Sequence, residues 1–428
     1  MARKVFISVL GTGFYKPCVY GKTDIKTRFI QVATLLNIKA KEWHKDDVGV
    51  VLLTDLARRT NWDIPDNKRE NQNKGIIEDY RGLKLEIETL GLPFTVSDIH
   101  IPDGKNEEEM WTIFTTLFEA LHDGDELYID LTHAFRYLPM LVLVLTNYAK
   151  FLKGIAVKSL TYGNYEARND DLAPIVDLLP IAALQDWTTA AADYLNNGFA
   201  GRIKELTDTT LRPLMCNETT RSQNLVDIKK FSSSIENLSN ERILCRGAGI
   251  SKGANVNNLV TAANQIEKMT VAPLKPIMEK IIASVDNESN TDIKRCTDAA
   301  RWCYNKHLYQ QAITILQEGI VTFFCSRHNI SIDDENMRGL VNSAFWGKAH
   351  SIEDVVVNPE HLDSLEAILN DNCMSEELAN LFSKITDLRN DFNHAGFNKK
   401  ATKNPNDIIK KINTYITLAE DILLNKSE

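Results

Sequence analysis

The sequence has no apolar run long enough to span a lipid bilayer. Its most apolar stretch, residues 138–145, gives way to Thr146 and Asn147, whereas a membrane-spanning helix needs about 20 apolar residues. The apolar segment that follows residues 1–4 is too short for a signal peptide and fits a first strand. We therefore expect a cytoplasmic protein with no membrane partner.

Paired cysteines and metal-binding motifs are also missing. The seven cysteines are odd in number, scattered and without any CxxC pair, while disulfide frameworks and zinc sites use closer, paired spacing. No HExxH motif or similar cluster of histidine and carboxylate is present. We expect free, buried thiols and no metal. The cysteines are Cys18, Cys216, Cys245, Cys296, Cys303, Cys325 and Cys373.

Positive charge is not in excess, because the net charge is -9. Proteins that coat long duplex nucleic acid need many cations to neutralise its phosphates. We therefore predict no stable DNA binding. A small anionic ligand or a local RNA cleft is compatible with this charge.

Residues 1–183 alternate between strand-like and helix-like patterns. Alternation of this kind predicts βαβ units and a Rossmann-like, largely parallel sheet. In such sheets ligands bind beyond the carboxyl ends of the strands. The loops that contain Gly11 and Thr132 are therefore expected to share one edge. The predicted strands are residues 5–10, 48–53, 95–101, 126–131 and 156–162, and the predicted helices are 27–36, 76–90, 107–121 and 137–152.

Residues 184–428 carry helical patterns and no convincing strand. We divide them into a helical connector, residues 184–290, which glycines interrupt near residue 247, and a compact all-α domain, residues 291–428. The polar and charged segment 61–73 is predicted to be a mobile loop. The fold class is thus α/β followed by all-α.

A helical stripe near the C-terminus ends in an arginine and a histidine. Leucine, isoleucine and phenylalanine recur at helical spacing through residues 378–392. Arg389 lies at the edge of this stripe, and His394 falls about 140° further round the helix. A guanidinium recognises phosphate in a planar, bidentate way. An imidazole exchanges protons near neutral pH.

Arg389, Asn390 and His394, with a helix over residues 304–324, resemble the HEPN ribonuclease domain, whose motif is Arg, a polar residue, three others and His. The resemblance covers roughly the last 130 residues. It implies a homodimer in which two Arg389/His394 pairs form one catalytic site, with Asn390 assisting. The alternative is a helical dimerisation domain with a fortuitous motif.

Two loops of the N-terminal half carry polar and aromatic residues. Gly11, Thr12, Gly13 and Phe14 follow the first strand, and Lys16 stands where a dinucleotide fingerprint needs its third glycine. The loop is therefore either a phosphate-binding turn or a plain connection. The second loop follows the fourth strand, and its Thr132 could instead cap a helix. It reads Thr132, His133, Ala134, Phe135 and Arg136.

These loops, with Tyr20, residues 27–29, Tyr162, Gly163 and Pro174, resemble the CARF domains of type III CRISPR accessory nucleases over residues 1–190. Ala134 departs from the pattern, since a glycine is expected there. The resemblance implies that cyclic oligoadenylate, with cyclic tetra-adenylate as the expected activator, binds these loops across a dimer. The expected ligand-binding residues are Gly11, Thr12, Gly13, Phe14, Thr132, His133, Ala134, Phe135, Arg136 and Tyr162.

Together the two resemblances imply an endoribonuclease that cyclic oligoadenylate activates and that cuts single-stranded RNA without a metal or cofactor, leaving 2′,3′-cyclic phosphate ends. Two alternatives stay open. The CARF-like domain could itself degrade the cyclic ligand, or the chain could be a ligand-responsive regulator without enzymatic activity.

Overall fold

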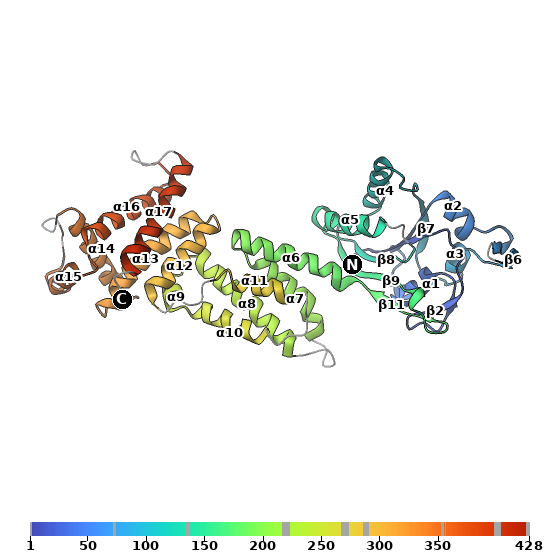
Figure 1. The fold of residues 1–428 in the computed structure, drawn as a ribbon, viewed down its shortest axis with the longest axis horizontal. Coiled ribbons are helices and arrows are strands. Elements are labelled where there is room, and N and C mark those ends of the chain that lie inside the picture. The colour runs from blue at the N-terminus through green and yellow to red at the C-terminus, as the bar shows by residue number, and fades with distance from the viewer. Residues whose placement is uncertain are drawn as a thin grey trace. The chain divides into compact units, whose positions relative to one another are not determined.

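The computed structural model describes residues 2–71, 74–133, 137–215, 223–266, 274–285, 291–351, 355, 357–397 and 404–424. The chain divides into two units, residues 1–183 and 184–428. The first is built on a β-sheet and the second is helical (Figure 1). The predicted order of an α/β part followed by an all-α part is confirmed.

A six-stranded sheet forms the centre of the first unit. The five predicted strands are all present and pair in parallel, and a sixth, β11, pairs antiparallel with β9. In the sheet order β11-β9-β8-β1-β4-β7, β1 and β8 are neighbours although two strands of this sheet lie between them in the chain. The strands are β1 (Lys4–Leu10), β4 (Val48–Leu53), β7 (Thr95–His100), β8 (Glu126–Asp130), β9 (Ala156–Gly163) and β11 (Ile175–Asp177).

Helices cover both faces of this sheet, as a parallel sheet requires. Side chains of β1 alternate between the faces. Val5, Ile7 and Val9 join the core with α4 (Glu107–Glu119) and α5 (Leu138–Lys153). Phe6 and Leu10 join the core with α1 (Ile30–Asn37) and α3 (Leu83–Glu88).

The region after β4 corrects two predictions. Residues 61–71 are ordered rather than a mobile loop: Asn61 and Trp62 are buried, and β5 (Lys68–Asn71) pairs with β6 (Ile76–Asp79). The helix predicted over residues 76–90 is confined to α3, because β6 occupies its first part and Gly82 precedes the helix. Gly75, at φ +66°, supplies the left-handed turn of this hairpin.

Short strands that the sequence did not predict form a second small sheet. It contains β10 (Leu172–Ala173), β2 (Cys18–Tyr20) and β3 (Lys26–Thr27). Short helical turns complete the unit: α2 (Asp55–Ala57), η1 (Ala40–Glu42), η2 (Arg58–Trp62), η3 (Pro65–Asn67) and η4 (Tyr165–Ala167).

The described residues of the second unit form helices joined by turns, without a strand. Its buried apolar residues, from Trp187 to Leu423, form a single core cluster, so residues 184–290 and 291–428 share one core. The predicted division at residue 290 stays a prediction. The helices are α6 (Leu179–Asn197), which begins in the first unit, α7 (Gly201–Met215), α8 (Gln223–Ile243), α9 (Gly247–Lys252), α10 (Ala254–Ile266), α11 (Lys275–Ile282), α12 (Asp292–Asn305), α13 (Tyr309–Arg327), α14 (Glu335–Ala349), η6 (Pro359–His361), α15 (Leu362–Leu369), α16 (Glu376–Asn393) and α17 (Pro405–Leu424).

None of the described helices is long and apolar enough to cross a membrane.

Candidate functional site

Two loops meet at the carboxyl edge of the central sheet. One follows β1 and the other follows β8, and the strand order reverses between these two neighbours, which is where ligands bind in open α/β sheets. A Cβ atom on Gly11 would lie 3.5 Å from the Cβ of His133. The ring of Tyr15 stacks on that of His133, with centroids 4.1 Å apart. The expectation that the two loops share one edge is confirmed.

Close packing explains the glycine that opens the first loop. A Cβ atom on Gly11 would lie 2.6 Å from the Tyr15 hydroxyl oxygen, which is closer than such atoms approach.

Two side chains hold this loop by hydrogen bonds to its backbone carbonyl groups. Asn61 Nδ2 donates to the carbonyl oxygens of Gly11 (2.7 Å) and Gly13 (2.9 Å). Arg69 donates to the carbonyls of Thr12 (2.9 Å) and Gly13 (3.0 Å).

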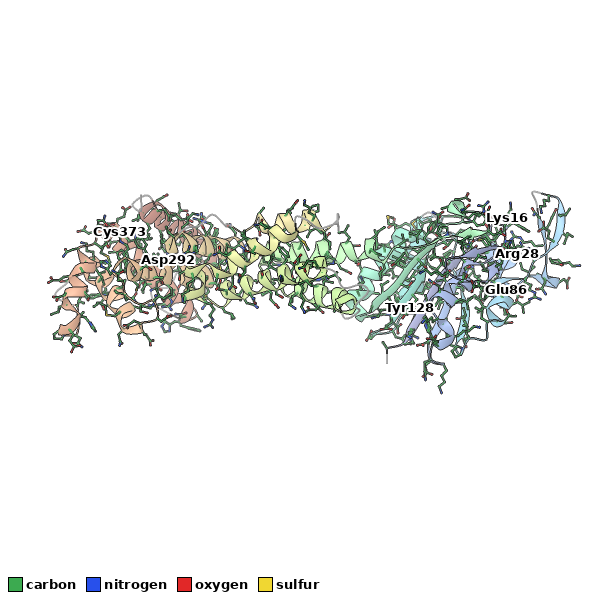
Figure 2. The ribbon with its side chains drawn as sticks, turned by 90° about the horizontal axis from the view of Figure 1, so that it is seen from below. Lys16, Arg28, Glu86, Tyr128, Asp292 and Cys373 are labelled. Atoms are coloured by element: carbon green, nitrogen blue, oxygen red, sulfur yellow. The ribbon has the colours of Figure 1, made fainter. Side chains whose placement is uncertain are left out.

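Two arginines place positive charge at this loop. Arg28, labelled in Figure 2, donates to the carbonyl of Tyr15 at 2.9 Å. Its guanidinium carbon lies 4.8 Å from the ring centroid of Tyr80, and that of Arg69 lies 5.2 Å from the same centroid. Within the described part of the chain, neither arginine forms an ion pair with a carboxylate. The edge thus has the local positive charge that phosphates need, although the chain as a whole is acidic.

Thr132 joins the ends of two strands. Its hydroxyl donates to Asp130 Oδ1 and accepts a hydrogen bond from the backbone N–H of Gly163 at 2.8 Å. Asp130 is fully buried and also accepts from the Ser8 hydroxyl at 2.7 Å, and burial raises its carboxyl pKa. Thr132 therefore fixes the start of the loop and does not cap a helix. One lone pair of its oxygen is left for a ligand.

His133 is a neutral imidazole with an unused atom. Burial lowers its pKa to about 4, so the ring carries no charge at neutral pH. Its Nε2 atom is buried and has no hydrogen-bond partner in the part of the chain that the structure describes. Tyr162, also expected to bind ligand, lies on β9 and is 36% exposed. Ala134, Phe135 and Arg136 lie outside the described residues.

The second candidate site lies on α16. Ser375 caps this helix by accepting from the backbone N–H of Leu378, and an apolar stripe that includes Ile385 and Leu388 is buried. Arg389 is half-buried at the edge of the stripe, whereas Asn390 and His394 are exposed. His394 is the residue at which the helix ends.

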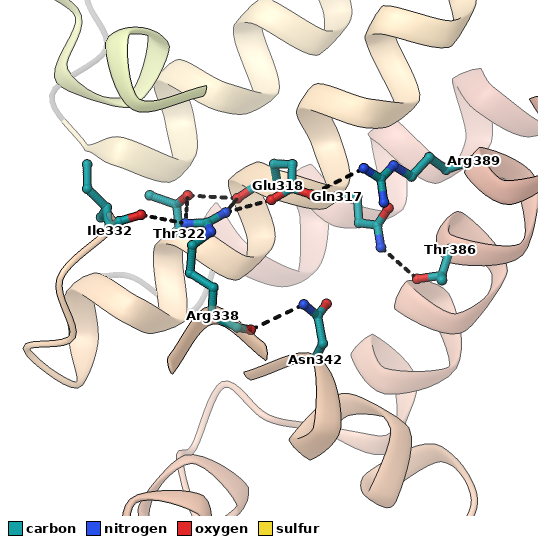
Figure 3. Close-up of polar contacts among 8 residues, drawn as sticks. All are labelled: Gln317, Glu318, Thr322, Ile332, Arg338, Asn342, Thr386 and Arg389. Carbon is teal, nitrogen blue, oxygen red and sulfur yellow. Dashed lines mark hydrogen bonds and ion pairs between the residues drawn. The ribbon is translucent and has the colours of Figure 1, made fainter. Parts of the chain in front are cut away.

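An acidic side chain links Arg389 to a second arginine (Figure 3). Glu318 of α13 pairs through Oε2 with Arg338 of α14 at 2.7 Å, and its Oε1 lies 3.7 Å from Arg389 Nη2. Arg338 also donates to the Thr322 hydroxyl at 3.0 Å. The Nε atom of Arg389 is buried and has no hydrogen-bond partner among the residues described. One carboxylate thus lies between two guanidinium groups at the motif.

The sequence patterns did not predict several of these residues. Asn61 and Arg69 lie in a segment predicted to be a loop, and Tyr80 lies in one predicted to be a helix. Only the fold brings them to the glycine loop. Glu318 has a weak signal, since it is the charged residue of the mostly apolar stretch 312–325 of α13. Arg338 has none, because α14 also contains Glu335 and Lys348. No group of histidine, cysteine and carboxylate side chains suited to a metal ion occurs among the residues that the structure describes.

Comparison with known proteins gives two similarities. The CRISPR-associated protein MJ1674 of Methanocaldococcus jannaschii is 24% identical over 260 residues, which cover 58% of this chain and 37% of that protein. The chain thus spans little more than a third of the length of this relative. Residues 5–166 match the family model described as CRISPR system endoribonuclease Csx1, CARF domain. The first unit of this chain is therefore CARF-like, similar to the CARF domain of a CRISPR endoribonuclease family.

Proposed function

We propose that the chain is a type III CRISPR accessory ribonuclease whose first unit binds cyclic oligoadenylate and whose second unit then cuts single-stranded RNA. The observation that carries this proposal is the match of residues 5–166 to the CARF domain of CRISPR endoribonucleases. The strand reversal between β1 and β8 lies within these residues, beside both loops.

The carboxyl edge of the sheet, where the loops after β1 and β8 meet, has chemistry suited to a ring of adenylates. We call it the sensor edge. The cations of Arg28 and Arg69 suit the phosphates, the stacked rings of Tyr15 and His133 suit bases, and the free Nε2 atom of His133 suits a polar ligand group. Only a small ring of phosphates has to be neutralised, so a net charge of -9 is no obstacle.

The RNA-cutting step that we propose needs no metal. The ribose 2′-oxygen attacks the adjacent phosphorus while a base removes its proton, and the 5′-oxygen leaves as an acid protonates it. His394 would exchange these protons and Arg389 would bind the charged non-bridging oxygens. One pair supplies too few groups for both ends of the reaction. We therefore propose that two chains combine their Arg389/His394 pairs, with Asn390 assisting.

An exposed apolar face on the first unit favours a homodimer. Helix α5 buries one side against the sheet and leaves Met140, Val144 and Phe151 68%, 56% and 87% exposed. A continuous exposed apolar surface of this kind marks an interaction site. We propose that two copies meet there and that residues 184–290 couple ligand binding to the RNA site. Coupling requires that the ligand bind the active arrangement more tightly than the resting one.

The experiment that tests the proposal is an RNA cleavage assay with the full chain in EDTA, with and without cyclic tetra-adenylate or hexa-adenylate. We expect cleavage only with the cyclic ligand, and products with 2′,3′-cyclic phosphate ends. Absence of cleavage with either ring would contradict the proposal.

The same assay distinguishes the alternatives. If the first unit degrades its ligand, the cyclic adenylate will become linear while the RNA stays intact. If the chain is a non-enzymatic regulator or carries a fortuitous motif, neither RNA nor ligand will change. Conversion of both would mean a ribonuclease that limits its own activation.

A further inference from the structure

A cavity of about 490 Å³ lies in the second unit. Its lining includes neither Arg389 nor His394. Its walls come from the end of α8, the end of α11 and one face of α12. Arg242, Trp302 and Lys306 line it, together with Arg301 and Asp298. The proposed ribonuclease function does not use these residues.

Arg242 brings a buried positive charge to this cavity. The side chain belongs to a residue that is only 4% exposed, and its guanidinium lies 4.7 Å from the Trp302 ring centroid. No carboxylate of the described residues forms an ion pair with it, and its Nη1 atom is buried without a hydrogen-bond partner. Burial lowers the pKa of Arg242, yet an arginine does not lose its proton in proteins. Such a charge is costly unless a counter-ion accompanies it.

A second cation lies beside the first. Lys306 donates a hydrogen bond to the carbonyl of Leu195, and its ammonium is 5.9 Å from the Trp302 centroid. Burial and the nearby Arg242 charge lower the pKa of Lys306.

The remaining charges of the lining are already paired. Arg301 forms an ion pair with Glu420 at 2.7 Å, and Asp298 forms one with Lys294 at 2.5 Å. Asp298 is the acidic residue of the lining, against three cations. The unused groups are therefore hydrogen-bond donors: a guanidinium and the remaining hydrogens of an ammonium.

We propose that this cavity binds a phosphate group, held by Arg242 and Lys306. A guanidinium matches the oxygens of phosphate in a bidentate geometry, and its charge is neutralised there. Trp302 is 5% exposed and the guanidinium lies over its ring, so a base has no free indole face on which to stack. The cavity thus recognises the phosphate itself, either free or at the end of a nucleotide.

Thermal unfolding of the full chain in sodium phosphate, compared with sodium chloride of equal ionic strength, tests this site. We expect phosphate to raise the Tm by several degrees, because a ligand stabilises the state that binds it. Arg242→Met should fold but lose this increment, since it removes the buried charge together with the binding group. Lys306→Met, at a half-buried position, should weaken phosphate binding at least tenfold in calorimetry. The exposed Arg246 is the control, and Arg246→Met should keep the full increment.

Titrations with AMP and ADP identify the source of the phosphate. A nucleotide that acts at concentrations at least tenfold below those of inorganic phosphate would identify a nucleotide site, and equal potency would identify a free phosphate site. The proposal fails if the wild-type chain shows no phosphate-specific increment. It also fails if Arg242→Met and Lys306→Met both keep that increment.

Discussion

His133 lies in the loop after β8, stacked on Tyr15 of the loop after β1, and its buried Nε2 atom has no hydrogen-bond partner among the described residues. Burial lowers its pKa to about 4 from the ordinary value of 6.5. Between these values the unfolded chain binds a proton that the folded chain does not. The contribution of the neutral ring to the free energy of unfolding is therefore complete above pH 6.5. It is lost as the pH falls toward 4, and the loss amounts to about 3 kcal/mol at most.

We therefore predict that replacing His133 flattens the pH dependence of stability. His133→Phe keeps an aromatic ring beside Tyr15 and removes the titration. Urea unfolding at pH 6.5 and pH 4.5 should show a smaller loss for this variant than for the wild type. His44 is exposed, and His44→Ala should behave as the wild type. An unchanged loss in His133→Phe would contradict the prediction.

Some of the individual site residues were predictable from the sequence, and others were not. Gly11 and Thr132 follow apolar runs, so their place at the carboxyl edge follows from the parallel sheet. The partners of Thr132, namely Asp130 and Gly163, lie on two strands, and no local pattern indicates a contact between those strands. Ordinary polar residues such as Asn61 acquire their role only through this tertiary structure.

Among the elements, strands β1 and β4 were predictable because each is an apolar run of suitable length. Strands β7, β8 and β9 mix apolar with polar residues and give a weaker signal. The hairpin of β5 and β6 was not predictable. Its strands are four residues long, one is polar, and Ile77 on the other is 70% exposed. What orders it is the set of hydrogen bonds from Arg69 to the glycine loop, a contact across more than fifty residues.

This hairpin gives a prediction about ligand binding. Arg69→Ala removes the donors to the carbonyls of Thr12 and Gly13, and with them a cation at the sensor edge. We expect the affinity for cyclic oligoadenylate to fall at least tenfold in calorimetry. Lys68 is an exposed neighbour on the same strand, and Lys68→Ala should change the affinity less than threefold. Equal affinities for the two variants would remove Arg69 from the site.

The packing of α13, α14 and α16 gives a prediction about cleavage. Glu318 lies between Arg338 and Arg389. Glu318→Gln would leave two guanidinium groups without their shared counter-charge, and their repulsion would displace Arg389. We expect the activated rate of RNA cleavage to fall about tenfold while ligand affinity stays constant.

The control for this variant is Glu376→Gln at an exposed position of α16, which should cleave as the wild type does. An unaltered rate in Glu318→Gln would show that Glu318 does not position Arg389.

At the scale of the whole molecule, the exposed face of α5 predicts self-association. Phe151→Glu places a charge in the apolar face, so we expect a monomer in sedimentation experiments and a loss of ligand-activated cleavage. Thr115 is exposed on α4, and Thr115→Glu should leave both properties unchanged. A dimeric Phe151→Glu variant with full activity would exclude this face as the interface.

We propose that Arg389 and His394 cut RNA in response to a ligand held elsewhere in the chain. The most direct measurement is the rate of RNA cleavage by His394→Ala in EDTA with saturating cyclic oligoadenylate, beside His361→Ala, a histidine of the same unit outside the motif. We predict that His394→Ala loses cleavage by at least a thousandfold and binds the cyclic ligand as tightly as the wild type, while His361→Ala retains both. Cleavage by His394→Ala at the rate of His361→Ala would contradict the account.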